Sequence, residues 1–217
     1  MADGCPQAHP LQETAEELTT YGWRVPSPNI HADDPRTSSG FHLLTPDQVP
    51  APYDERGVDA AIRDVSNAHV AEDGLLAWFQ STWRADPRPL AADVWVFSPD
   101  FQRILVVEHR WRGLVPPGGR VEPWETPREG AIRELAEETG LELVVADRPA
   151  FAAARSYRSD WSATLNLSYW AIADPTLKLL SEVGQPAHWI NVGSDWRTFH
   201  KQDAAVMARF AEQQSNS

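Results

Sequence analysis

The chain has 217 residues, of which 42% are hydrophobic and ten are tryptophan, so a substantial core is expected. Its formal net charge is −12, which argues against non-specific binding to nucleic acid or to an anionic membrane, because both favour basic surfaces. A polyanionic small molecule remains compatible with this charge, since bound divalent cations can reverse the local field. We therefore expect a small-molecule partner, and neither a nucleic-acid nor a membrane partner.

The first 90 residues predict a mainly helical extension with loops. Residues 11–21 favour a short helix, and the stretches rich in Pro, Ser and Asp that follow favour loops. Residues 58–84 carry two amphipathic apolar patterns, which predict two helices interrupted near Asp73 and Gly74. Because these helices must bury their apolar faces, we expect the extension to cap a pocket, to mediate a homodimer, or both.

Targeting and redox signals are sparse. Residues 1–25 lack a basic start and an apolar run, so no secretory signal is expected. The longest wholly aliphatic run, residues 104–107, is too short to span a membrane, and cytoplasmic residence is the default expectation. The single cysteine, Cys5, cannot form an internal disulfide and is interpreted as an incidental thiol.

From residue 91 onward, short strand patterns are interrupted by a helix pattern and close with another. Residues 93–98 and 103–110 predict a β-hairpin. Further elements expected are a tight loop at Gly118 and Gly119, strands within 143–157, 162–173 and 187–192, and an amphipathic helix over 203–213. This order predicts an α/β domain with a mixed sheet over residues 91–217.

The helix between these strands has clear ends. Thr126 can cap its first turn, Pro127 suits the first helical position, and Glu129 completes a capping box. Gly140 suits the C-terminal cap. The sequence therefore predicts a helix over residues 127–139.

Three carboxylates cluster on this helix, because Glu134, Glu137 and Glu138 lie within one turn of each other. Hard cations such as Mg²⁺ and Mn²⁺ prefer oxygen ligands of this kind. Just before the helix, Gly118 and Gly119 would let the backbone approach a ligand closely or adopt a positive φ. The spacing thus indicates a metal–phosphate site rather than a merely solvated surface.

The segment resembles the Nudix box, G-x5-E-x7-R-E-U-x-E-E-x-G-U, in which U is a bulky aliphatic residue. All nine specified positions match, namely Gly119, Glu125, Arg133, Glu134, Leu135, Glu137, Glu138, Gly140 and Leu141. The resemblance implies a Nudix-like α/β/α sandwich with a mixed sheet over residues 91–217, after the extension at 1–90. It also implies a metal-dependent pyrophosphohydrolase acting on a nucleotide or nucleoside diphosphate derivative.

The resemblance also implies roles for individual residues. Arg133 would orient a catalytic glutamate, and Glu125 would hold the loop. The general base would be Glu134 or a carboxylate on a later loop, for which Glu182 is the candidate. The ligands implied for Mg²⁺ or Mn²⁺ are Gly118 through its carbonyl, Glu134, Glu137, Glu138 and Glu182.

Substrate contacts are expected outside the box, where arginines and aromatics are mixed. The candidates are Arg110 and Arg112, beside Trp111, and Arg155 and Tyr157. The competing interpretation is that these arginines are solvated at strand ends. Trp124 occupies a position where many Nudix boxes carry glycine, and it would cover the loop, stack on substrate or stay exposed.

Three other functions stay open at this point. One is a catalytically inactive Nudix-fold module that binds a ligand or regulates. Another is a hydrolase of a non-nucleoside diphosphate, such as an isoprenoid or sugar diphosphate. An isoprenoid diphosphate isomerase is disfavoured, because that activity needs a dedicated cysteine and Cys5 lies near the N-terminus.

Overall fold

The computed structural model describes residues 53–85, 90–110, 112–156, 163–194 and 201–216. Its elements are α2 (Glu55–Asn67), β1 (Val70–Ala71), α3 (Leu75–Ala85), β2 (Ala91–Phe97), β3 (Arg103–His109), β4 (Gly113–Val115), β5 (Gly118–Arg120), α4 (Pro127–Thr139), β6 (Phe151–Arg155), β7 (Thr164–Ile172), β8 (Ala187–Asn191) and α5 (Lys201–Ser215). The helix expected over 11–21 and Cys5 lie outside the described residues. Within those residues, no helix combines the length and apolar character needed to cross a membrane.

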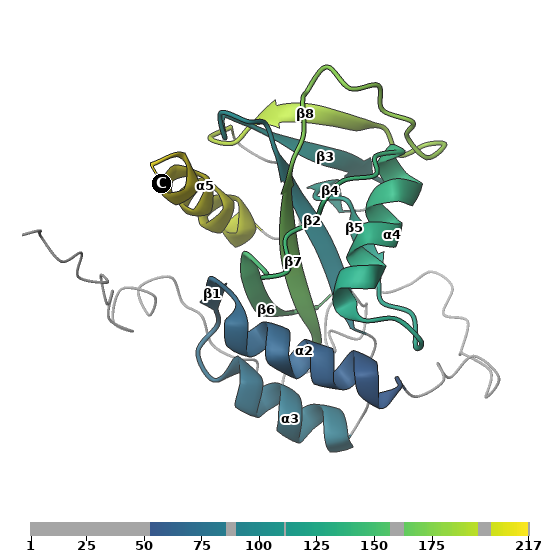
Figure 1. The fold of residues 1–217 in the computed structure, drawn as a ribbon, viewed down its shortest axis with the longest axis vertical. Coiled ribbons are helices and arrows are strands. Elements are labelled where there is room, and N and C mark those ends of the chain that lie inside the picture. Colours follow the sequence, from purple (N-terminus) through teal and green to yellow (C-terminus); the bar gives the residue numbers. More distant parts are fainter. Residues whose placement is uncertain (1–52, 86–89, 111, 157–162, 195–200, 217) are drawn as a thin grey trace, which may run out of the picture. The chain divides into compact units, whose positions relative to one another are not determined.

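The strands form one mixed sheet (Figure 1). Its main order is β1-β6-β7-β2-β3-β4, with β5 paired to β2 and β8 paired to β3. The central pair, β2 and β7, is parallel, as is the short pair of β1 and β6, whereas the other pairs are antiparallel. The expected hairpin is confirmed, because β2 and β3 pair antiparallel.

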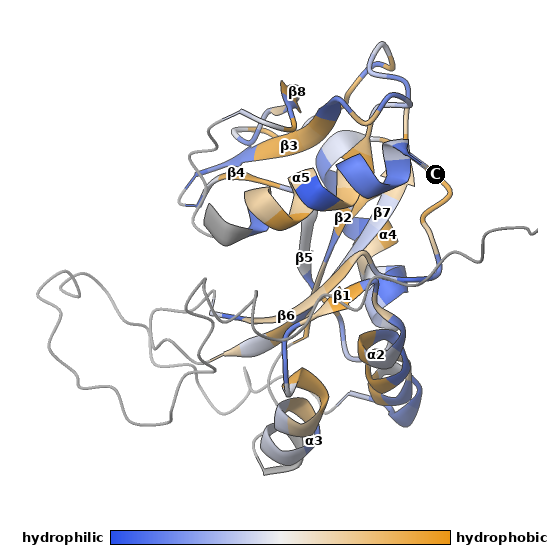
Figure 2. Ribbon diagram, turned by 90° about the vertical axis from the view of Figure 1, so that its left-hand side faces the viewer, coloured by the Kyte–Doolittle hydropathy of each residue, from blue (hydrophilic) through white to orange (hydrophobic). Residues whose placement is uncertain are grey.

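Helices cover both faces of the sheet, as expected for an α/β/α sandwich. On one face Val94 and Val96 of β2 join a core with Leu135 of α4 and with residues of α2 and α3. On the other face Trp95 of β2 meets Phe210 of α5, with ring centroids 5.9 Å apart. In Figure 2, α2 is hydrophobic on one side and hydrophilic on the other, so its apolar face is the buried one.

Helix α4 has the bounds expected from its capping signals. The Thr126 side chain accepts a hydrogen bond from the backbone N–H of Glu129, and the Glu129 carboxylate accepts one from the backbone N–H of Thr126. Gly140 ends the helix at φ 70°, a left-handed conformation that glycine adopts without strain.

Three local expectations need correction. Gly118 and Gly119 lie in strand β5 rather than in a tight loop, and neither has a positive φ. A run of glycines has no alternating side chains, so it carries no strand signal, and pairing with β2 decides its conformation. The strand expected within 143–157 is confined to β6, because residues 141–150 lie outside the sheet.

Candidate active site

The two glycines of β5 bring the backbone against helix α4. The backbone N–H of Gly118 donates to the Glu138 carboxylate at 2.8 Å. A Cβ atom on Gly119 would lie 2.6 Å from the Glu134 carboxylate, which is closer than real contacts allow. Gly118 likewise packs against β2, where its Cβ would lie 2.4 Å from that of Asp93. Close approach, rather than a positive φ, therefore requires glycine at both positions.

Arg133 gathers the carboxylates of the box into one network. Its guanidinium donates through Nη2 and Nε to Glu125, at 2.7 and 3.3 Å, and through Nη2 to the carbonyl of Arg120. Its Nη1 donates to Glu134 at 2.8 Å and to Glu137 at 3.2 Å. The forked contact with Glu125 fixes the plane of the guanidinium, which in turn orients Glu134.

Burial shifts the titration of the carboxylates next to β5. Desolvation raises the pKa of Glu138 to about 7, although the N–H of Gly118 opposes the shift. The negative charges of Glu134 and Glu182 raise the pKa of Glu138 further, and Arg112 lowers it. Desolvation also raises the pKa of Glu134, against the effect of Arg133. Both groups therefore lie where a bound cation would favour their ionised forms.

Part of the expected site is thus brought together by the fold. Glu182 and Arg112 lie within electrostatic range of Glu138, and the Arg112 backbone N–H donates to Nδ1 of His109. The side chain of Arg110 is exposed. Desolvation lowers the pKa of His109, and the charges of Arg112 and Arg110 lower it further. Tyr157 and Trp111 lie outside the described residues.

Arg155 occupies a different environment. It is buried, with 5% of its side chain exposed, and pairs with Glu72 at 2.7 Å and Asp203 at 2.6 Å. Its guanidinium also lies 5.2 Å from the centroid of the Phe151 ring. Glu72 lies just after β1 and Asp203 lies in α5, so the two ion pairs of Arg155 connect these two segments to strand β6.

A buried polar cluster on the α5 side of the sheet escapes the sequence analysis. Asp93 accepts a hydrogen bond from Nδ2 of Asn166 at 2.9 Å, and the same amide contacts Oγ of Ser168 at 3.1 Å. Desolvation raises the pKa of Asp93 to about 7, while Asn166 and Ser168 oppose the shift. Its Oδ1 is shielded from solvent and has no hydrogen-bond partner in the described part of the chain. The sequence signal for this cluster is Asp93 itself, a carboxylate inside the otherwise apolar strand β2.

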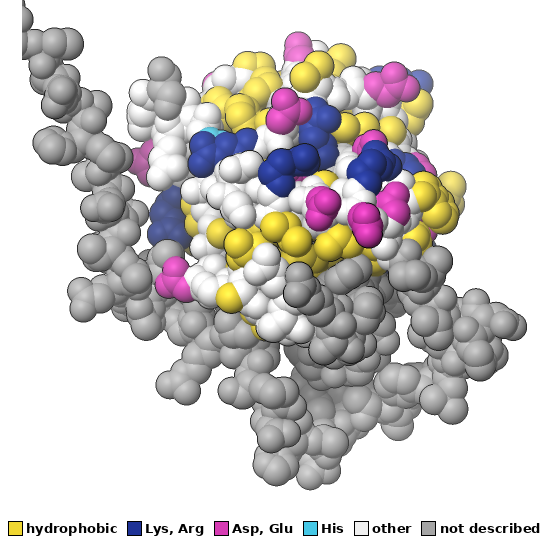
Figure 3. Space-filling model, turned by 60° about the horizontal axis from the view of Figure 1, so that its bottom comes forward, with side chains coloured by type: hydrophobic (Ala, Val, Ile, Leu, Met, Phe, Trp, Pro, Cys, Tyr) yellow, Lys and Arg dark blue, Asp and Glu magenta, His cyan; other side chains and the backbone are white. Residues whose placement is uncertain are grey.

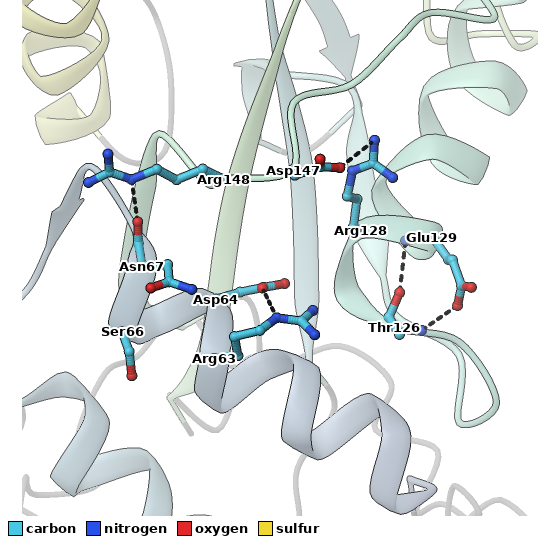
Figure 4. Close-up of a pocket in the computed structure, with 9 residues that line it drawn as sticks. All are labelled: Arg63, Asp64, Ser66, Asn67, Thr126, Arg128, Glu129, Asp147 and Arg148. Carbon is cyan, nitrogen blue, oxygen red and sulfur yellow. Dashed lines mark hydrogen bonds and ion pairs between the residues drawn. The ribbon is translucent and has the colours of Figure 1, made fainter.

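A separate hollow of about 690 Å³ opens between α2, the start of α4 and residues 147–148 (Figure 4). Three arginines line it, but so do three carboxylates, and none of the box carboxylates Glu134, Glu137 and Glu138 does. Arg128 donates to the carbonyls of Val145 and Ala146 and pairs with Asp147. Basic and acidic side chains are likewise interspersed on the face shown in Figure 3, so no large patch of one sign stands out there.

The donor chemistry of the α4 face suits a hard divalent cation. Glu134, Glu137, Glu138 and the carbonyl of Gly118 offer only oxygen atoms, the ligands that Mg²⁺ and Mn²⁺ prefer. Among the described residues, no three acidic, histidine or cysteine side chains converge closely enough to hold an ion as they stand. Arg133 contacts one oxygen of Glu134 and one of Glu137, so a cation bound by these carboxylates would share them with its guanidinium.

The fold and this face together define an α/β-sandwich protein whose acidic helix lies against a glycine strand. The family model described as the NUDIX domain matches residues 87–210, which is more than half of the chain. The chain therefore belongs to the Nudix family of hydrolases. This match confirms the family that the box motif predicts.

Individual relatives are more distant or match only in part. YtkD of Bacillus subtilis (strain 168), named provisionally as an 8-oxo-dGTP diphosphatase, is 49% identical over 50 residues. That match covers 23% of this chain and 32% of YtkD, about a third of the relative's length. A binary complex of a C. elegans Ap4A hydrolase superposes with a TM-score of 0.51 at 15% identity, covering 60% of this chain and 100% of that one. A NUDIX-family hydrolase from Clostridium perfringens gives a TM-score of 0.48 at 15% identity, over 58% and 97% of the two chains.

Proposed function

We propose that this protein is a pyrophosphohydrolase that cleaves the diphosphate linkage of a nucleotide or nucleoside diphosphate derivative. The observation that carries the proposal is the complete Nudix box, folded as α4 with Glu138 hydrogen-bonded to the backbone of Gly118. All three helix carboxylates of the box are present, with Glu138 buried, Glu134 partly buried and Glu137 exposed, and this complete set fits hydrolysis better than passive ligand binding. In the reaction, water attacks phosphorus and the phosphoric anhydride bond breaks.

The proposed metal ligands are Glu134, Glu137, Glu138 and the carbonyl of Gly118, with Glu182 as a further carboxylate. A bound Mg²⁺ or Mn²⁺ would neutralise charge on the phosphates and acidify a water molecule. Arg133 would hold Glu134 in place through its fork with Glu125. These roles follow from the box and from the contacts of Arg133, and each can be tested by substitution.

Two carboxylates are candidates for the general base. Glu134 is partly buried beside Gly119, and desolvation raises its pKa above the ordinary value, which makes it a stronger base. Glu182 is exposed but acts electrostatically on Glu138. Loss of the base should remove the acidic limb of the pH–rate profile, whereas loss of a metal ligand should raise the cation concentration needed for activity.

The proposed substrate contacts are Arg110, Arg112 and Tyr157, with Arg155 as a weaker candidate because two carboxylates already hold it. Arg112 is favoured most, since its charge reaches Glu138. The name of YtkD suggests a purine nucleoside triphosphate as the first substrate to test. Under this proposal, a dinucleotide or nucleotide sugar would give two phosphorylated products instead of pyrophosphate.

A substrate panel with Mg²⁺ and with Mn²⁺ tests the proposal. It should contain 8-oxo-dGTP, the ordinary dNTPs, Ap4A, ADP-ribose, a nucleotide sugar and an isoprenoid diphosphate, with products separated by chromatography. We expect cation-dependent cleavage of at least one nucleotide, abolished by EDTA. No turnover on any nucleotide, alongside turnover of the isoprenoid diphosphate, would replace the nucleotide assignment. Binding without turnover would instead favour a regulatory module.

A further inference from the structure

Residues 53–57, here called the clamp, precede the NUDIX match at 87–210 and run beside residues 121–125, here called the box loop. The Tyr53 hydroxyl donates to the carbonyl of Val121 at 2.7 Å and accepts from the N–H of Leu90 at 3.0 Å. Tyr53 is buried, so both of these backbone groups depend on its hydroxyl rather than on water.

The next two contacts follow the box loop in register. The backbone N–H of Asp54 donates to the carbonyl of Pro123 at 3.1 Å. Gly57 lies against Glu125, because a Cβ on Gly57 would be 3.0 Å from the Glu125 carbonyl oxygen. The clamp therefore contacts the backbone of the box loop along most of its length.

Arg56 joins the box loop to the first turn of α4. Its Nη2 donates to the carbonyl of Trp124 at 2.7 Å, and its Nη1 donates to the Glu129 carboxylate at 2.7 Å. Glu129 is the residue whose other oxygen caps α4 through the N–H of Thr126. The guanidinium of Arg56 thus bridges the box loop, through Nη2, and the first turn of α4, through Nη1.

The box loop in turn sets the position of Arg133. Within the loop, the N–H of Glu122 donates to Oε1 of Glu125 at 2.7 Å, which fixes the carboxylate. That same oxygen accepts from Nη2 of Arg133 at 2.7 Å. Any shift of the loop backbone is therefore passed to Arg133 and from there to Glu134.

We propose that the clamp positions the box loop, so that Arg56 and Tyr53 act as positioning residues for Arg133 and for the carboxylates of α4. Further along α2, Arg63 and Asp64 line the hollow of Figure 4, while the buried face of α2 shares a core with Leu135 of α4. The clamp is the part of this segment whose contacts described above reach the backbone of the box loop. Its catalytic consequence rests on the function proposed above.

Arg56→Ala and Tyr53→Phe test this proposal in the full-length chain. Arg63→Ala is the matched control, because Arg63 lies on the same helix and is 65% exposed against 54% for Arg56, but pairs with Asp64 instead of the loop. Two readouts are needed: steady-state kinetics on the substrate found in the panel, and amide hydrogen exchange of peptides covering 121–130 and β7. The exchange readout needs neither substrate nor cation.

We expect both clamp variants to accelerate exchange in 121–130 but not in β7, and to lower kcat by about 10- to 100-fold with KM unchanged. Arg56→Lys, which keeps the charge without the fork, should restore part of kcat. Arg63→Ala should leave both readouts unchanged. A rescue by lysine would not be expected if Arg56 acted only through overall stability.

Unchanged exchange in 121–130 in both clamp variants would overturn the proposal. Faster exchange with an unchanged kcat would also overturn it, since the loop would then move without affecting catalysis. If the unsubstituted protein hydrolysed nothing in the panel, the proposed function would fail on its own. The exchange measurements would still decide whether the clamp holds the loop.

Discussion

Two arginines in this molecule each gather carboxylates, and their surroundings differ. Arg133 is 30% exposed and contacts Glu125, Glu134 and Glu137, all within the box itself. Arg155 is 5% exposed and contacts Glu72 and Asp203, which lie 83 and 48 residues away in the chain. The first network is local and partly solvated, which suits the cation site proposed above. The second is buried and holds distant elements together.

From this contrast we expect Arg155 to act on stability and the residues around Arg133 to act on the proposed reaction. Removing a buried arginine leaves carboxylates without their counter-charge, whereas removing an exposed partner costs little. Conversely, a carboxylate that binds a cation contributes to the reaction and little to folding. The predictions below vary one network at a time and measure both quantities.

The largest effect is expected from Arg155→Met, which keeps the aliphatic stem and removes the charge. We expect the free energy of unfolding to fall by about 3 kcal/mol, lowering Tm by roughly 6 to 12 °C. Thermal unfolding measured against Arg103→Met, an exposed arginine on β3, checks this. The comparison would break if the folded variant instead showed normal Tm and a raised KM, since Arg155 would then contact substrate.

The next largest effects are expected from Glu138→Gln and Glu134→Gln, which should lower activity rather than stability. Each should lower kcat by at least ~10²-fold, because an uncharged amide is a poor ligand for a cation and no base. Tm should be unchanged or higher, since burial already raises the pKa of both carboxyls. Kinetics over a range of Mn²⁺ concentrations is the measurement, with exposed Glu142→Gln as control. Near-normal turnover in both variants would refute the metal assignment.

The sequence predicted the helix that carries Arg133 because its signals are local, whereas the roles of Arg133 and Glu125 follow from the resemblance to the Nudix box. The caps of α4, the spacing of Glu134, Glu137 and Glu138, and the box glycines all lie within one short segment. Helix periodicity and capping chemistry act over a few residues, so they can be read without knowing the fold. For this reason, the predicted helix over 127–139 has the same bounds as α4 in the structure.

The remaining contacts depend on tertiary structure. Tyr53 reaches Val121 across 68 positions, and nothing in either local sequence indicates the pairing. Arg155, two positions before Tyr157, resembles a substrate contact until Glu72 and Asp203 are placed beside it. Long-range pairing of this kind follows from strand order, which local propensity does not determine.

Replacing each arginine with lysine should give smaller effects, on kcat for Arg133 and on Tm for Arg155. Arg133→Lys keeps a positive charge but loses the forked contact with Glu125, so we expect kcat to fall by about tenfold, with Tm nearly unchanged. Arg155→Lys should show the opposite pattern, a lower Tm with normal kcat. Measuring both quantities in both variants gives the test. Equal losses of kcat would mean that the two networks are coupled rather than separate.

Asp93 offers the smallest and most specific test, because it lies between the two networks. It packs against Gly118 and also senses the charges of Asp203 and Arg155. Its pKa is raised from the ordinary 3.8 to about 7, chiefly by desolvation. Between these values the native state retains a proton that the unfolded chain has lost. The free energy of unfolding must therefore fall as pH rises through this window.

Asp93→Asn removes that dependence while keeping the shape and an acceptor for Asn166. The Tm of the variant minus that of the unsubstituted protein should be smallest near pH 4, widen up to about pH 7, and then stay constant. The shift from 3.8 to about 7 sets an upper limit of roughly 4 kcal/mol on this widening, and we expect at least about 1 kcal/mol, or about 2 to 4 °C. Thermal unfolding in EDTA at a series of pH values measures it. The pKa of Glu138 is also raised to about 7, but its contribution to the pH dependence cancels in the difference because both proteins carry it. Parallel Tm curves would show that folding does not raise the pKa of Asp93.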